Sequence, residues 1–208
     1  MKFNLRYKLR AAGAGVAVAL TVGACAGLAQ TADRPDVKVG DRWVFKVSSR
    51  MGPGAMEASD RVWIVTSVDE TGIKGTENGK PLMLTPDLNV LESPRSKDSD
   101  PRRLSFPLHL GKQWSYTDTY VLKRLGVEGR ISVNAKVVGY EKVRVPAGEF
   151  DAFKLERKGN WQLTSGETGE STETYWYAPA ARTVVKSEYR APHVPDTTTE
   201  LAEFKLQP

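Results

Sequence analysis

The stretch Gly40-Asp41-Arg42-Trp43-Val44-Phe45-Lys46-Val47-Ser48 decides the fold class. Trp43, Phe45 and Val47 recur at every second position, and Arg42, Lys46 and Ser48 lie on the opposite face. This period of two is typical of a β-strand with one buried face. Similar runs of Val, Trp, Tyr, Phe and Thr recur between clusters of Gly, Pro, Asn and Asp, whereas no window of a dozen residues keeps a helical apolar stripe. The sequence predicts a mainly β protein.

The spacing of these runs predicts about nine to ten strands, in an antiparallel sheet curved into a half-barrel, a barrel or a sandwich. Asn78-Gly79 predicts a tight hairpin, because both residues readily adopt positive φ. Pro146-Ala147-Gly148 predicts a second sharp reversal between strands. Residues 93–103 (SPRSKDSDPRR) contain two prolines, six charged residues and no apolar residue, so we expect a solvated loop there.

Two short segments resemble each other. Residues 40–45 (GDRWVF) and 111–116 (GKQWSY) share the pattern glycine, two polar residues, tryptophan, any residue and an aromatic residue. Each would begin a strand by placing a tryptophan in the core. The resemblance raises the hypothesis that the domain over residues 37–208 consists of two similar halves, 37–104 and 105–208. Chance, or the shared demands of starting a strand, would also explain it.

The first 24 residues have the features of an export signal. Residues 1–10 carry four positive charges, and residues 11–24 form an uncharged apolar run. The run ends in Val22-Gly23-Ala24-Cys25, which resembles a bacterial lipobox, so Cys25 is the predicted lipidation site. Such an anchor would hold the chain to a membrane. The alternative is cleavage after Ala26 or Ala29, which would discard Cys25.

We expect residues 25–36 to be a tether and residues 37–208 to form a single β-rich domain. The favoured location is the periplasmic face of the outer membrane, as a lipoprotein; the alternative is a soluble periplasmic or secreted protein. The mature chain cannot form an internal disulfide, because Cys25 is the single cysteine.

The charge of the domain argues against nucleic acid as a partner. The leader accounts for four of the five net positive charges, so the exported part is nearly neutral. A nucleic-acid-binding domain would need a basic face of its own.

Residues with catalytic or metal-binding potential are few. His109 and His193 lack a second histidine or cysteine at metal-ligand spacing, and no G-x-S-x-G motif is present. Asp98-Ser99-Asp100 lacks the other ligands of a calcium loop, and residues 75–80 (GTENGK) are better explained by a hairpin turn than by a phosphate loop. We therefore expect no catalytic residue, no metal and no cofactor.

Four aromatic residues form the candidate binding site: Trp161, Tyr175, Trp176 and Tyr177. On a strand, Tyr175 and Tyr177 must face opposite to Trp176. One side is expected in the core. The other side is a candidate platform for a sugar or a lipid tail, although packing alone also favours aromatic residues in strands.

Three segments resemble a group of uncharacterised proteobacterial exported proteins and lipoproteins. The segments are Phe106-Pro107-Leu108-His109-Leu110-Gly111-Lys112-Gln113-Trp114-Ser115-Tyr116, Val143-Arg144-Val145-Pro146-Ala147-Gly148-Glu149-Phe150-Asp151-Ala152-Phe153-Lys154-Leu155-Glu156, and Tyr175-Trp176-Tyr177-Ala178-Pro179 with Val184-Val185-Lys186. Members commonly carry a glycine near Ala181-Arg182, which this sequence lacks. The resemblance implies a β-rich envelope domain and supplies no catalytic residue.

Three functions compete at this point. The first is a non-enzymatic binding or carrier domain of the cell envelope, for an apolar ligand or an apolar surface of a partner. The second is an accessory subunit of an envelope complex or a cell-wall-binding module, which would use the aromatic residues or the 93–103 segment. The third is a hydrolase with an unrecognised site.

Overall fold

The computed structural model describes residues 30–50, 56–192 and 194–208. Cys25 and the export signal lie outside these residues. The strands are β1 (Thr31–Ala32), β2 (Arg42–Arg50), β3 (Met56–Asp69), β4 (Gly72–Glu77), β5 (Lys80–Leu84), β6 (Val90–Glu92), β7 (Ser96–Asp98), β8 (Leu108–His109), β9 (Gln113–Leu122), β10 (Val127–Val145), β11 (Gly148–Leu163), β12 (Thr168–Ala178), β13 (Thr183–Arg190) and β14 (Asp196–Lys205). A short 3-10 helix, η1, covers Pro179–Ala181.

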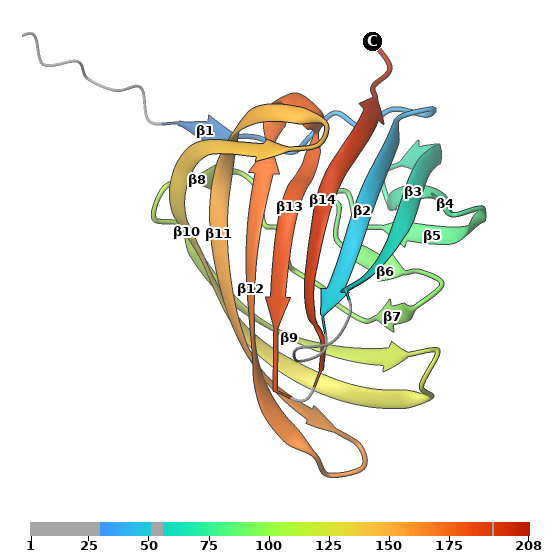
Figure 1. The fold of residues 1–208 in the computed structure, drawn as a ribbon, viewed down its shortest axis with the longest axis vertical. Coiled ribbons are helices and arrows are strands. Elements are labelled where there is room, and N and C mark those ends of the chain that lie inside the picture. Colours follow the sequence, from blue (N-terminus) through green and yellow to red (C-terminus); the bar gives the residue numbers. More distant parts are fainter. Residues whose placement is uncertain (1–29, 51–55, 193) are drawn as a thin grey trace, which may run out of the picture.

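Twelve antiparallel strands close into a barrel, in the order β10-β11-β12-β13-β14-β2-β3-β4-β5-β6-β7-β9 (Figure 1). The prediction of an antiparallel β fold is confirmed, and the architecture is the barrel among the three that the sequence left open. The predicted strand number was too low. β6 and β7 have three residues each and lie in or beside a segment with no apolar alternation, so their sequence carries little strand signal.

Two predicted turns are confirmed. Asn78 (φ 49°) and Gly79 (φ 77°) join β4 to β5. Residues 146–147 join β10 to β11, and this hairpin curls over the upper end of the barrel in Figure 1. The amide of Ala147 donates a hydrogen bond of 3.0 Å to the carbonyl oxygen of Leu201 on β14. Phe150, close behind the turn, is buried and stacks edge-on against Phe204, also on β14.

The two segments with the shared tryptophan pattern begin their strands with the same hydrogen bonds. Gly40 (φ 91°) donates to the carbonyl of Val65 at 2.9 Å, and Gly111 (φ 83°) donates to that of Val137 at 3.0 Å. Val65 and Val137 each donate back, to the residue after the glycine. The β3–β4 pairing shifts register just after Val65, and the β10–β11 pairing shifts just after Val137. This similarity is local to the two strand starts, and the hypothesis of two similar halves stays a prediction.

Part of the predicted tether packs on the barrel. β1 pairs with β8, with Ala32 opposite Leu108, and both side chains are buried. Residues 31–32, which the sequence predicts in the tether, thus pair with a strand of the domain. The rest of the predicted domain division stays a prediction.

Candidate functional site

The inside of the barrel changes from apolar to polar. One part is a packed apolar core, which contains Trp43, Phe45, Leu82, Leu84, Leu104, Leu108, Val137, Phe153, Leu155, Tyr177, Val185 and Leu201. The other part holds charged side chains, which are Arg61, Glu77, Asp98, Arg103, Asp118, Arg157 and Glu173, and the half-exposed Arg95 reaches Glu77 from its edge. Buried charges are costly unless they are paired, so the partners of each decide what this region can do.

Glu77 at the end of β4 is the centre of the first charged group. Its side chain is 3% exposed and accepts two hydrogen bonds from the guanidinium of Arg95. It also accepts a hydrogen bond of 3.0 Å from the indole of Trp63 on β3. These donors satisfy both oxygens of the carboxylate.

Arg61 on β3 lies beside this group without a good partner. Its Nε is buried, has no hydrogen-bond partner in the described part of the chain, and lies 3.9 Å from Glu77 Oε2. Burial, and then the neighbouring charge of Arg95, lower the pKa of Arg61 to about 10. The side chain therefore remains a cation at neutral pH, in surroundings that disfavour its charge.

A second charged group connects β7 to the segment that follows it. Arg103 Nη2 lies 3.3 Å from an oxygen of Asp98. Burial, and after it the charge of Asp118, raise the pKa of Asp98, although Arg103 opposes that shift. Asp118 on β9 is 3% exposed and accepts hydrogen bonds of 2.9, 3.0 and 2.9 Å from the Ser99 amide, the Ser99 hydroxyl and the Asp100 amide.

Arg157 on β11 forms the third group. It pairs with Glu173 and donates hydrogen bonds to the hydroxyls of Tyr116 and, at 2.8 Å, Tyr175. Its guanidinium carbon lies 5.7 Å from the ring centre of Tyr116 and 5.2 Å from that of Tyr175. These contacts hold β9, β11 and β12 together inside the barrel.

A cavity of about 130 Å³ lies between these groups and the apolar core. Its apolar lining includes Phe45, Leu88, Leu104 and Val184, and its polar lining includes Arg61, Arg103, Tyr175, Ser187 and Thr199. Arg61 and Arg103 are 22% and 32% exposed, so solvent reaches this region. The cavity offers cationic and hydroxyl donors beside an apolar wall.

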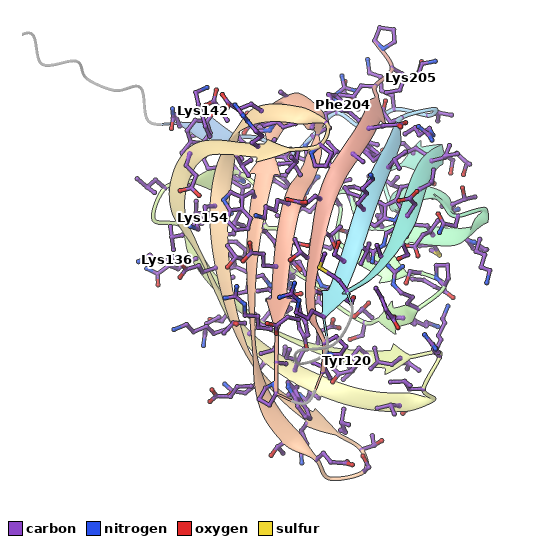
Figure 2. All side chains as sticks on the ribbon, viewed as in Figure 1. Tyr120, Lys136, Lys142, Lys154, Phe204 and Lys205 are labelled. Carbon is purple, nitrogen blue, oxygen red and sulfur yellow. The ribbon has the colours of Figure 1, made fainter. Side chains whose placement is uncertain are left out.

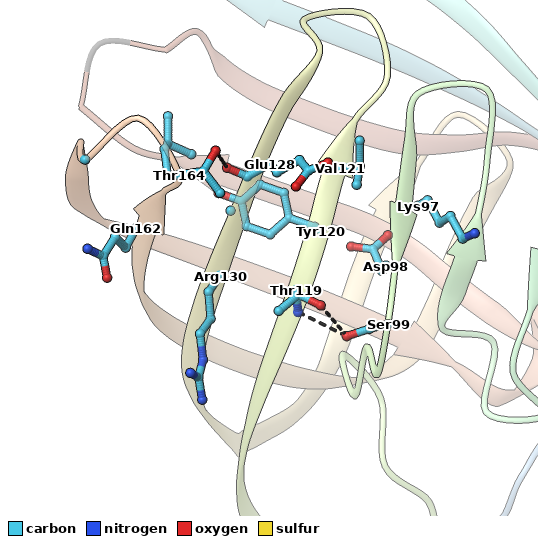
Figure 3. A pocket seen from close by; sticks show the side chains of 13 residues that line it. Lys97, Asp98, Ser99, Thr119, Tyr120, Val121, Glu128, Arg130, Gln162 and Thr164 are labelled. Atoms are coloured by element: carbon cyan, nitrogen blue, oxygen red, sulfur yellow. Dashed lines mark hydrogen bonds between the residues drawn. The ribbon is translucent and has the colours of Figure 1, made fainter.

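A larger hollow of about 590 Å³ lies near the Tyr120 end of the barrel (Figures 2 and 3). Tyr120, Glu128, Arg130 and Gln162 are among its lining residues, and the hydroxyl of Ser99 accepts a hydrogen bond of 3.1 Å from the amide of Thr119 (Figure 3). The ring of Tyr120 covers Gly129, where a Cβ atom would lie 2.7 Å from it. Asp98 also lines this hollow, so its pair with Arg103 lies between the hollow and the inner cavity.

The four predicted aromatic site residues lie in four different places. Tyr175 lines the inner cavity, and Tyr177 is 1% exposed in the core, edge-on to Phe106. Trp161 packs over Gly169 on the neighbouring strand, so a Cβ there would clash with its ring.

Trp176 lies on the opposite face of β12 from these tyrosines, among charged side chains. The ammonium groups of Lys154 and Lys186 lie 5.3 and 5.2 Å from its ring centre. Its indole donates a hydrogen bond of 2.8 Å to Glu141, and the side chain is only 8% exposed. The four residues therefore do not form one common surface.

The prediction of a solvated loop over residues 93–103 was only partly right. Arg95, Lys97, Ser99, Asp100 and Arg102 are exposed, whereas residues 96–98 form β7 and Ser93 and Asp98 are buried. Arg95 and Arg103 form ion pairs with the buried carboxylates of Glu77 and Asp98. Sequence reasoning took the charges as a sign of solvent exposure. Arg102 and Arg103 pair within the segment, with Asp100 and Asp98, whereas the partner of Arg95 is Glu77 on β4, which no local pattern in the segment revealed.

The two histidines, the other candidates from the sequence, do not lie in a catalytic or metal-binding cluster within the described residues. His109 is exposed on β8 and contacts the carbonyl of Leu110 at 3.2 Å, and His193 lies outside the described residues. Within residues 30–50, 56–192 and 194–208, no group of three His, Cys, Asp or Glu side chains could hold a metal ion. The same residues include no helix long and apolar enough to cross a membrane.

Comparison with known proteins identifies the fold. A predicted lipoprotein from Parabacteroides distasonis aligns with 84% of this chain and 99% of its own, at 15% identity and a TM-score of 0.55. A predicted exported protein with a YmcC-like fold, from Bacteroides fragilis, also aligns with 84% and 99%, at 18% identity and a TM-score of 0.55. The chain shares their fold. The hypothetical lipoprotein YmcC from Escherichia coli aligns with 80% and 85%, at 13% identity and a TM-score of 0.49. No family model and no curated protein matches the chain.

Proposed function

We propose that this protein is a non-enzymatic ligand-binding barrel of the cell envelope, exported and tethered to a membrane through Cys25. The observation that carries the proposal is the inner cavity, whose wall combines Phe45, Leu88 and Leu104 with Arg61 and Tyr175. Such a mixture of an apolar wall and a few polar groups is the usual lining of a small-molecule site.

The size of the cavity limits the ligand. Its volume of about 130 Å³ is small beside the about 300–1,000 Å³ of typical small-molecule pockets. The barrel is therefore suited to a small amphiphilic molecule, or to one end of a larger one.

Three observations support the envelope location. The lipobox-like Val22-Gly23-Ala24-Cys25 follows an apolar run with basic residues before it. Proteins of the same fold are described as a predicted lipoprotein and a predicted exported protein. The resemblance to proteobacterial exported proteins and lipoproteins points to the same compartment. The outer-membrane face is the favoured site.

Native mass spectrometry tests the binding function. The full chain, with its own leader, is expressed in a Gram-negative host and purified under gentle conditions. We expect a mass beyond that of the processed polypeptide and its acyl groups. A clean polypeptide mass in repeated preparations would contradict the proposal and favour the accessory-subunit alternative.

A matched pair of variants locates the ligand. Ser187→Leu places a larger side chain in the cavity wall, whereas Ser132→Leu makes the same change at an exposed position of β10. We expect the extra mass to disappear in Ser187→Leu and to persist in Ser132→Leu. Persistence in both variants would place the ligand elsewhere.

The anchor has an independent test. Labelled palmitate added to growing cells is expected to enter the wild-type chain and not the Cys25→Ser variant. Equal labelling of the two would contradict lipidation at Cys25, and it would leave the binding function to be judged by the mass measurement.

A further inference from the structure

The charged groups inside the barrel are not evenly paired. Three arginines have carboxylate partners within the described chain: Arg95 with Glu77, Arg103 with Asp98, and Arg157 with Glu173. The remaining carboxylate, Asp118, is satisfied by two backbone amides and a hydroxyl. Arg61 shares Glu77 with Arg95: its Nε lies 3.9 Å from Glu77 Oε2 and has no hydrogen-bond partner within residues 30–50, 56–192 and 194–208.

This arrangement is unfavourable for Arg61. The nearest carboxylate, Glu77, already accepts three hydrogen bonds, and Arg61 lies near the like charge of Arg95. Arg61 is mostly buried and its Nε makes no hydrogen bond within the described chain, which destabilises the fold because the protein only partly replaces the water that the charge has lost. An apolar residue at this position would give a more stable fold unless the cation binds a ligand.

The surroundings of Arg61 indicate which class of ligand it would bind. Arg61 and Arg103 both line the cavity, and among the described residues Arg103 forms one ion pair, at 3.3 Å, with Asp98. The hydroxyls of Tyr175, Ser187 and Thr199 line the same space. Guanidinium groups match the planar carboxylate and the phosphate geometry, and hydroxyls supply further donors.

We propose that the cavity binds an anionic group, a carboxylate or a phosphate, through Arg61 and Arg103, with any short apolar portion against Phe45, Leu88 and Leu104. This inference rests on the proposed binding function and specifies the chemical class of its ligand. The anion would come either from a free small molecule or from the headgroup of a lipid. Both present the same charged group to Arg61.

Calorimetric titration of the purified full chain tests the inference with four probes. Inorganic phosphate and butyrate represent free anions, butanol is the neutral analogue of butyrate, and dihexanoyl phosphatidic acid below its micellar concentration represents a lipid headgroup. We expect at least one anion to bind and butanol to bind at least about tenfold more weakly than butyrate, since charge-assisted hydrogen bonds carry the affinity. Binding of phosphatidic acid alone would assign the anion to a lipid.

Two variants connect the binding to Arg61. Arg61→Met keeps the length of the side chain and removes its charge, and Arg144→Met makes the same change on a side chain that is 84% exposed. We expect Arg61→Met to lose about tenfold or more in affinity for the anion and Arg144→Met to lose none. Arg61→Lys, which retains the charge without the planar fork, should fall between wild type and Arg61→Met.

An NMR measurement on the wild-type chain does not depend on the folding of any variant. The Nε–H of Arg61 has no partner in the described chain, so an anion that binds there should shift its ¹H–¹⁵N resonance. No shift with any anion, or equal affinity of wild type and Arg61→Met, would overturn the inference. If mass spectrometry then still finds a neutral ligand that Ser187→Leu excludes, the binding function stands without an anion site.

Discussion

Trp43 and Trp114 occupy corresponding positions in two strands and make the same type of hydrogen bond. Each lies three residues after a glycine with positive φ, at the start of β2 or β9. The indole of Trp43 donates to the carbonyl of Ala181 at 2.8 Å, and that of Trp114 donates to the carbonyl of Arg102 at 2.7 Å. The first carbonyl is buried and the second is near solvent, so the two hydrogen bonds should contribute differently to the free energy of unfolding.

Phenylalanine at these two positions measures that difference. Trp43→Phe leaves the buried carbonyl of Ala181 without a donor and a small void beside it, so we expect a loss of about 2–3 kcal/mol in the free energy of unfolding. Trp114→Phe should lose about 1 kcal/mol or less, because water can replace the donor to Arg102. Urea denaturation of both variants checks the order, and equal losses would contradict it.

Arg182 adopts the left-handed conformation, with φ of 52°, at the turn after η1. This is the region where proteins of the resembling group commonly have glycine. The side chain compensates by a contact of 3.4 Å to buried Asp41 and a hydrogen bond of 3.2 Å to the carbonyl of Gln207.

Two substitutions of Arg182 separate the backbone strain from the contacts. Both Arg182→Ala and Arg182→Gly remove the contact with Asp41, but only glycine relieves the strain. We expect Arg182→Gly to be about 1 kcal/mol more stable than Arg182→Ala. Thermal or urea unfolding of the two measures the difference, and an alanine variant as stable as the glycine variant would refute the strain.

Removal of Arg157 should destabilise the barrel through its partner. Arg157→Met leaves Glu173 and two tyrosine hydroxyls without their donor, and we expect a loss of about 3 kcal/mol. The double variant Arg157→Met/Glu173→Gln should recover part of this loss, because no unpaired carboxylate remains. Chemical denaturation of the two single variants and the double variant gives the coupling. Purely additive effects would show that the pair is not coupled.

The stability of the folded protein depends on the protonation of Glu141 at acid pH. The hydrogen bond from Trp176, and then the charge of Lys154, lower the pKa of Glu141 below its ordinary value of 4.5. The stabilising contribution is therefore fully present above pH 4.5 and is lost as the pH falls through the lower, folded-state pKa. The side chain is 46% exposed, so screening by solvent limits the effect to below about 1 kcal/mol.

The indole ¹H–¹⁵N resonance of Trp176 is the direct reporter of this titration. It should shift between pH 6 and pH 3 with an apparent pKa below 4.5. In Glu141→Gln, which retains an acceptor oxygen without a titrating group, that transition should be absent. An unchanged transition in the variant would assign the titration to another carboxylate.

Local sequence features predicted the local structure well. Asn78-Gly79 and the reversal at Pro146-Ala147 are turns because their residues accept the required backbone angles whatever surrounds them. Alternation placed Trp43 and Phe45 together in the core, and it separated Tyr175 and Tyr177 from Trp176. These results need only the geometry of a strand.

The polar interior could not be predicted in the same way. Arg61 resembles a surface residue in the sequence, and nothing near Arg95 in the sequence indicates that it pairs with a buried carboxylate. Glu77 comes near them only through the pairing of β3 with β4 and the path of the chain after β6. The candidate site was therefore missed, except for Tyr175, which lines the cavity.

By itself, the sequence determined the β class, the faces of the strands, the position of the turns and the features of an export signal, since each depends on neighbours along the chain. Tertiary structure alone decided the closure of the sheet, through β14 with β2 and β7 with β9, and the meeting of the arginines around one cavity. The physical reason is that closure joins strands far apart in sequence. Whether a buried charge stabilises or destabilises the fold depends on the partners that this closure brings near it.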